Sequence, residues 1–63
     1  MKMETITIIK EYEGKTGAVH IVRYTDANGR ESFHVKHTNR ISLNEWFNNK
    51  YDAIKYAQFA SRY

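Results

Sequence analysis

The fold depends most on the last third of the chain, ISLNEWFNNKYDAIKYAQFASRY (residues 41–63). Ser42, followed three residues later by Glu45, has the pattern of a capping box, in which each side chain satisfies a free backbone N–H at the start of a helix. Ile41 and Trp46 have the spacing of the apolar contact that often accompanies such a cap. These signals predict one C-terminal helix over about residues 43–62.

The pair Asn48-Asn49 is the weak point of this prediction. Both residues are poor helix formers, and Asn49 could instead cap a second helix that begins at Lys50. The apolar spacing continues through the pair without a break, which favours a single helix. A kink at the pair is the alternative, and it would rotate the residues that follow.

At ~100° per residue, the apolar side chains of this helix fall on two faces. The expected core face consists of Leu43, Trp46, Phe47, Tyr51, Ala53, Ile54, Ala57 and Ala60. Its three alanines would let the helix lie close against a sheet.

The opposite face of the helix carries a second group of aromatic residues. It consists of Tyr56, Phe59 and Tyr63, with Asp52 beside them. Rings at positions i, i+3 and i+7 on the outer side of a helix suit contact with another protein. These four residues are therefore the predicted protein-binding site.

Three strands are expected ahead of the helix, at about residues 3–12, 18–25 and 30–38. The first contains Thr5-Ile6-Thr7-Ile8-Ile9, a β-branched run in which Ile6 and Ile8 alternate. The predicted fold is α+β: a three-stranded antiparallel meander with one C-terminal helix packed on one face (β-β-β-α), in a single domain over residues 1–63. The covered face is expected to include Ile6, Ile8, Phe33 and Val35.

The turn between the second and third strands has two readings. Asp26 at the first position and Gly29 at the fourth favour a type I turn closed by a glycine bulge, which would place Ile21 opposite Val35. A two-residue Asn-Gly turn would instead place Val22 opposite Val35. A slip of one residue exchanges the faces of one strand relative to the other, and both registers remain open at this point.

Composition limits the class of protein. The chain has 63 residues, no cysteine and a formal net charge of +3. A domain of this size buries only ~60% of its unfolded surface, so contact with a partner is a reasonable source of added stability. With no disulfide framework and no apolar run long enough for a membrane span or a signal peptide, a cytoplasmic location is expected and a membrane partner is not.

A basic stretch supports an alternative function in nucleic-acid binding. Its candidate contacts are Arg23, His34, Lys36, His37 and Arg40. Lysine and arginine would supply charge to phosphates, and the histidines would donate hydrogen bonds. The ten lysines and arginines are spread along the chain, however, so composition does not select this partner.

No catalytic, metal-binding or cofactor-binding motif is expected. His34 and His37 are three residues apart, and would point to opposite faces of a strand. No cysteine supports a metal site with them, and the carboxylates are too dispersed for a paired acid–base site. The chain is therefore predicted not to be an enzyme.

In size, cysteine-free composition and absence of catalytic motifs, the chain is similar to the small orphan proteins of phages and mobile elements. This resemblance implies a non-enzymatic binding module that inhibits a host enzyme or defence complex, in the host cytoplasm if phage-encoded. The expected partner is a larger protein or a second copy of the chain. The alternatives are a nucleic-acid-binding domain with a basic sheet face, and a structural homodimer whose helices pair.

Overall fold

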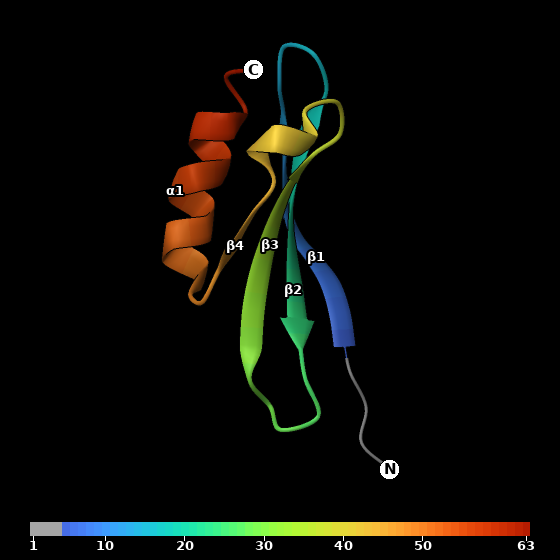
Figure 1. Cartoon of the computed structure of the whole chain (residues 1–63), viewed down its shortest axis with the longest axis vertical. Coiled ribbons are helices and arrows are strands. Elements are labelled where there is room, and N and C mark those ends of the chain that lie inside the picture. Colours follow the sequence, from blue (N-terminus) through green and yellow to red (C-terminus); the bar gives the residue numbers. More distant parts are fainter. Residues whose placement is uncertain (1–4) are drawn as a thin grey trace.

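A computed structural model describes residues 5–63, which form a four-stranded antiparallel sheet and one C-terminal α-helix (Figure 1). The elements in chain order are β1 (Thr5–Glu13), β2 (Ala18–Thr25), β3 (Glu31–His37), the 3₁₀ turn η1 (Ile41–Leu43), β4 (Glu45–Phe47) and α1 (Lys50–Ala60). The α+β class and the C-terminal helix are confirmed, but the sheet has four strands where three were predicted. Residues 3 and 4 of the first predicted strand lie outside the described residues.

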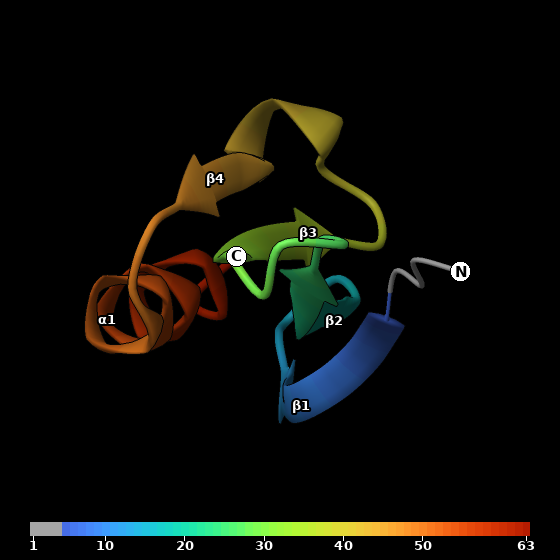
Figure 2. The ribbon, with the colours of Figure 1, turned by 90° about the horizontal axis from the view of Figure 1, so that it is seen from below.

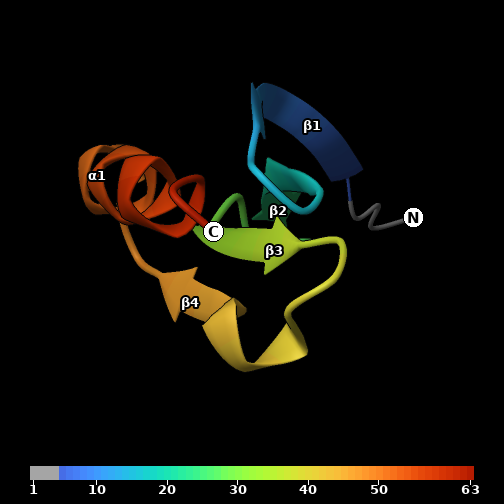
Figure 3. The same cartoon turned by 90° about the horizontal axis from the view of Figure 1, so that it is seen from above.

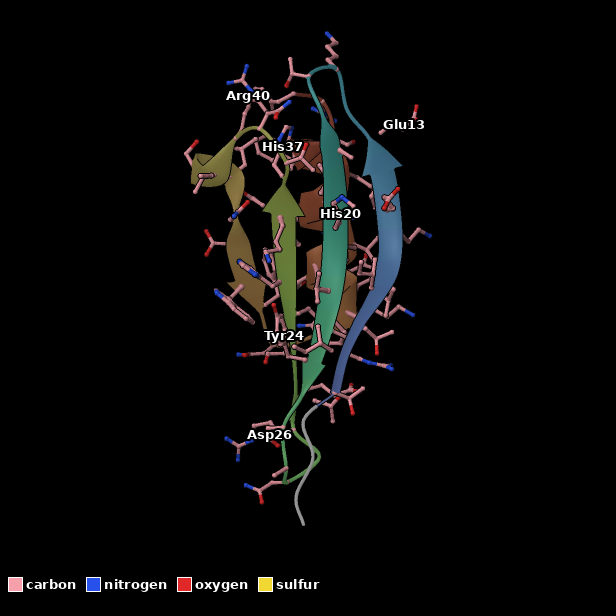
Figure 4. All side chains as sticks on the ribbon, turned by 90° about the vertical axis from the view of Figure 1, so that its right-hand side faces the viewer. Glu13, His20, Tyr24, Asp26, His37 and Arg40 are labelled. Carbon is pink, nitrogen blue, oxygen red and sulfur yellow. The ribbon has the colours of Figure 1, made fainter. Side chains whose placement is uncertain are left out.

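The strands follow one another across the sheet in the order β1-β2-β3-β4. The helix lies on one side of this curved sheet, and in the view along the strands it sits beside β3 and β4 (Figure 2). The opposite side, here called the open face, is turned toward the viewer in Figure 4, with α1 behind the strands. Within residues 5–63, every helix is too short or too polar to cross a membrane.

The hairpin between β2 and β3 adopts the glycine-bulge register. Asp26 O accepts a hydrogen bond from Gly29 N at 3.0 Å, and Gly29 has φ 81°, a conformation that glycine adopts at little cost. The Asp26 side chain closes the turn, because its Oδ1 accepts from the backbone N–H of Asn28 and of Arg30. Ile21 therefore pairs with Val35, and the two-residue alternative is not formed.

A bulge in β1 overturns the predicted facing of its isoleucines. The register with β2 shifts between Ile8 and Lys10, which leaves Ile9 as an extra residue. The extra residue lets Ile9 and Tyr12, three positions apart, both pack against the core. Ile6 and Ile8 therefore lie on the face opposite to Ile9, which is the open face. Their predicted place under the helix is wrong.

The predicted helix over residues 43–62 is also wrong in its first part. Glu45–Phe47 pairs with Phe33–Val35 of β3 as a short strand, and the helix begins only at Lys50. The cap is Asn49: its Oδ1 accepts from Asp52 N and its Nδ2 donates to Asp52 Oδ2, both at 2.9 Å. The capping box predicted at Ser42 and Glu45 is not formed, since a 3₁₀ turn and a strand occupy those positions.

The core lies between α1 and the covered face of the sheet. Its buried members are Val19, Ile21, Phe33, Val35, Ala53, Ala57 and Ala60. The three alanines have no exposed surface, which confirms the predicted close approach of helix to sheet. Leu43, Phe47 and Ile54 pack at its margin as expected, whereas Trp46 and Tyr51 are exposed and their prediction as core residues is wrong.

The end of the chain is held against the turn between β1 and β2. Thr16 N donates to Tyr63 O at 3.0 Å. A Cβ atom on Gly14 would lie 3.1 Å from Ser61 O, so the small residue permits this approach. Figures 1 and 3 show the carboxyl end of α1 beside the same end of the sheet. The helix is thus fixed at both ends, by Asn49 and by this contact.

Candidate functional site

The open face carries the largest exposed apolar side chains of the sheet. Pairing brings six residues from all four strands together, and we call this group the open-face patch. Its members are Ile6, Ile8, Val22, Tyr24, His34 and Trp46. Ile6, Ile8 and Trp46 are 65%, 60% and 53% exposed. Isolated exposed apolar residues are ordinary, but a contiguous group on an uncovered sheet face is characteristic of an interaction surface.

The centre of the patch is already densely packed. Ile8, Val22, His34 and Trp46 form one cross-strand row over the four strands. Val22 is buried although no helix lies over it, because its neighbours in the row close around it. Cross-strand contacts of this kind hold side chains in fixed positions, so the patch is preorganised for contact.

Stacked rings form the rigid end of the patch. The His34 and Trp46 rings lie parallel, with centroids 4.1 Å apart and an interplanar angle of 2°, and the Tyr24 ring is tilted against Trp46 at 5.1 Å. Burial lowers the pKa of His34 below its usual value, Lys36 lowers it further, and Glu45 opposes the shift. The neutral imidazole is therefore favoured, and the patch carries little charge at this point.

A polar row marks one boundary of the patch. Glu11, His20 and Lys36 are cross-strand neighbours next to the row that contains Ile8. His20 Nδ1 lies 3.0 Å from Glu11 Oε2. In Figure 4, His20 lies on the open face between the ends marked by Glu13 and Asp26. An apolar centre with a polar boundary matches the usual anatomy of a protein interface.

A pocket of about 300 Å³ opens at the other end of the patch. Its walls come from Ile6, Tyr24 and Trp46, and its polar lining includes Asp26 and Ser32. Ser32 is cross-strand neighbour to Tyr24, and β4 ends at Phe47, so no large side chain fills the space beside Trp46. The pocket is therefore a direct result of a small residue next to a short edge strand.

The aromatic members of the predicted protein-binding site form a separate series, with Tyr56 and Phe59 on α1 and Tyr63 just beyond its end. With Phe47 it makes a ladder of ring contacts, Phe47–Tyr56, Tyr56–Phe59 and Phe59–Tyr63, at centroid distances of 5.3, 5.7 and 5.6 Å. We call this ladder the helix stripe. Phe59 and Tyr63 are exposed, while Tyr56 is half-buried against the core. The Asp52 side chain takes part in the helix cap, where its Oδ2 accepts from Asn49 Nδ2.

Burial also affects the chemistry of Tyr56. It raises the pKa of this phenol above its usual value, and Glu45 and Tyr63 raise it further. The hydroxyl therefore keeps its proton at neutral pH. The Tyr56 phenol is thus uncharged, within reach of the charge of Glu45 on β4.

The five predicted nucleic-acid contacts are not gathered on one surface. His34 and Lys36 lie on the open face, whereas His37 is buried, and its Nδ1 accepts from the backbone N–H of Asn39 and of Arg40. Arg23 shares the face of Phe33, with its Nε 3.8 Å from Glu31 Oε2. The Arg40 guanidinium lies over the Tyr63 ring, at 5.6 Å from the centroid.

The sequence prediction did not find the open-face patch. The glycine-bulge register already placed Val22, Tyr24 and His34 on one face, opposite Ile21 and Val35. The missing step was the assignment of Trp46 to a strand, which the alternative cap at Asn49 would have permitted. With that start of the helix, Trp46 could have been joined to this face, whereas the facing of Ile6 and Ile8 also depends on the bulge in β1.

The open-face patch and the helix stripe consist mainly of apolar and aromatic side chains that are suited to binding another molecule. Within residues 5–63, no group of three or more His, Cys, Asp or Glu side chains is placed to hold a metal ion. The function of the chain has to be inferred from these surfaces, because comparison with protein-family models, with curated proteins and with solved structures finds no match.

Proposed function

We propose that this chain is a non-enzymatic protein-binding module that docks on a larger protein through the open-face patch. The observation that carries the proposal is the exposure of Ile6 and Ile8 on β1 and of Trp46 on β4, all on the sheet face that α1 does not cover. Tryptophan is among the residues that contribute most to binding at protein interfaces.

The energetics favour docking on this face. Full burial of an aliphatic or aromatic side chain of this size stabilises a complex by about 1.5–3 kcal/mol. Trp46 is stacked on His34 before any partner arrives, so little side-chain freedom is lost on binding. Three such residues at the centre of an interface are enough to provide its main anchors.

The expected consequence of docking is inhibition of a host enzyme or defence complex. The proposal takes this from the small phage and mobile-element proteins that the chain resembles in size and composition. A bound domain of 63 residues excludes other ligands from the surface that it covers. Such steric blocking requires no catalytic group from the inhibitor.

Affinity capture from the native cell, with immobilised variants, tests the proposal. The double variant Ile6→Ser/Ile8→Ser should retain at least tenfold less partner than the wild type, since ~1.4 kcal/mol corresponds to a factor of ten. Tyr51→Ser is the matched control, because Tyr51 is 69% exposed on α1 and belongs to neither surface. Circular dichroism verifies the fold of each variant.

The variant Phe59→Ser distinguishes the open-face patch from the helix stripe. Capture should survive this substitution. If Phe59→Ser abolishes capture while the double isoleucine variant retains it, the helix stripe is the interface and the open face is not. Sedimentation across concentrations identifies a second copy as the partner if the wild type dimerises and Ile8→Ser does not.

Nucleic-acid binding is the second candidate. It is favoured by the exposed Trp46 ring and the half-buried Tyr24 ring beside it on an antiparallel sheet, an arrangement on which bases can stack. Affinity for DNA should then fall steeply with salt, and Lys36→Ala and Arg40→Ala should reduce that dependence. Absence of binding to both duplex and single-stranded DNA at low salt would eliminate this candidate.

A further inference from the structure

The pocket at the end of the open-face patch combines aromatic walls with one carboxylate. Tyr24 and Trp46 supply the rings, and Asp26 supplies the negative charge. The backbone N–H groups of Asn28 and Arg30 bond to Asp26 Oδ1, which leaves Oδ2 for a ligand. Within residues 5–63, Asp26 takes part in no ion pair. In Figure 4, Tyr24 and Asp26 lie near each other at the same end of the sheet.

We infer that this pocket binds an arginine side chain of the partner protein. A guanidinium group can stack on the Trp46 indole while one of its N–H groups donates to Asp26 Oδ2. The Ser32 hydroxyl lines the same pocket and offers a further acceptor. An arginine side chain has only donors at its head and an apolar stem, which matches acceptors set among apolar walls.

Other occupants fit the pocket less well. A phosphate or carboxylate would meet the charge of Asp26 at short range. An apolar side chain would remove that carboxylate from water without giving it a hydrogen bond, which is costly. Lysine would satisfy the charge, but its compact and strongly hydrated ammonium stacks on an indole less favourably than a guanidinium does.

The inference rests on the proposed function, because the arginine belongs to the partner protein. Binding to the pocket can be tested without that partner. The probe is N-acetyl-arginine-N-methylamide, and the neutral control is the citrulline compound, which has nearly the same shape. Trp46 is the only tryptophan, so its fluorescence and its indole N–H resonance report on the pocket. Arginine should bind saturably and at least about twofold more tightly than citrulline, the smallest ratio expected for one cation–π contact at an exposed site.

Two variants separate charge from shape. Asp26→Asn keeps an Oδ1 acceptor for the turn but removes the charge, and it should lower the arginine affinity severalfold while leaving the citrulline affinity nearly unchanged. Ser32→Leu fills the pocket and should abolish the response of Trp46. Glu13→Gln is the matched control, because it makes the same change of charge at the opposite end of the sheet (Figure 4).

Equal affinities for arginine and citrulline, or full arginine binding by Ser32→Leu, would overturn the inference. Either result would leave partner capture by the open-face patch intact. Conversely, arginine binding by a chain that captures no protein would refute the proposed function but not the pocket. Ser32→Leu still decides the matter if Asp26→Asn does not fold.

Discussion

At the scale of single residues, Ile8 and Ile9 are adjacent in β1 and have opposite surroundings. Ile9 packs against the core, while Ile8 lies on the open face and is mainly exposed. Adjacent strand residues point to opposite faces, and the bulge at Ile9 puts Ile9 on the same side as Tyr12, so Ile8 is the one turned to the open face. Two identical side chains therefore have different expected roles: Ile9 in stability, and Ile8 in the proposed contact with a partner.

Alanine substitutions should separate these roles. Ile9→Ala should lower the free energy of unfolding by about 1–3 kcal/mol, because it removes a side chain packed on the core. Ile8→Ala should cost less than about 1 kcal/mol, since most of its surface is in water already. Urea unfolding followed by Trp46 fluorescence measures both. An equal loss for the two variants would contradict the assigned faces.

His34 gives the chain a predicted pH dependence. Its folded-state pKa lies below the ordinary value of 6.5, so the unfolded chain takes up a proton first as the pH falls. The contribution of the neutral His34 is complete above pH ~6.5 and declines as the pH falls toward the lower folded-state pKa. His34→Phe keeps a ring against Trp46 and should lose less stability over that range than the wild type does.

Urea unfolding at several pH values, with and without the substitution, measures this difference. Because the other histidines are common to both chains, the difference isolates His34. A direct NMR titration of the His34 ring provides the check. A folded-state pKa above 6.5 would mean that stacking of the imidazolium on Trp46 outweighs burial and Lys36.

At the scale of elements, the decisive feature is the position at which α1 begins. Asn49 and Asp52 exchange two hydrogen bonds at the first turn, while Ser42 lies in a 3₁₀ turn with no side-chain cap bond. This start frees Trp46 and Phe47 to join the sheet, with Trp46 on the open face and Phe47 against Tyr56. The open-face patch therefore depends on the helix cap.

Substitution of the two cap candidates tests this assignment. Asn49→Ala should destabilise the protein by about 1 kcal/mol, the usual cost of losing an N-cap side chain. Ser42→Ala should change stability by less than about 0.5 kcal/mol, as is usual for a surface substitution. Thermal unfolding followed by circular dichroism measures both. A larger loss for Ser42→Ala would favour the single long helix.

Two local features could be read from the sequence because they depend on neighbouring residues alone: the glycine-bulge turn, which the sequence favoured but left open against a two-residue turn, and the close packing of the α1 alanines. Asp26 and Gly29 specify their turn through backbone conformation, and the alanines of α1 specify a close packing distance. Trp46 was misplaced because three residues of strand are too few to show a period of two. Ile6 and Ile8 were misplaced because an alternating sequence does not reveal a bulge. The bulge in β1 lets both Ile9 and Tyr12 pack on a core formed by residues far along the chain.

At the scale of the whole molecule, one helix covers one face of a sheet that has two. In a chain of 63 residues the core is small, and a partner that covers the second face adds to the stability of the folded state. The helix stripe lies elsewhere, and Lys36 lies at the boundary of the patch. Among residues 5–63, the open-face patch is the surface where exposed apolar side chains from several strands meet. This patch is the centre of the proposed function.

Hydroxyl-radical footprinting of the captured complex, compared with the free chain, tests this proposal most directly. Trp46 is exposed in the free protein and should be oxidised readily, as should Tyr51 and Phe59 on the helix. In the complex, oxidation of Trp46 should fall severalfold while that of Tyr51 and Phe59 stays the same. Unchanged oxidation of Trp46, with protection of Phe59 instead, would contradict docking through the open face.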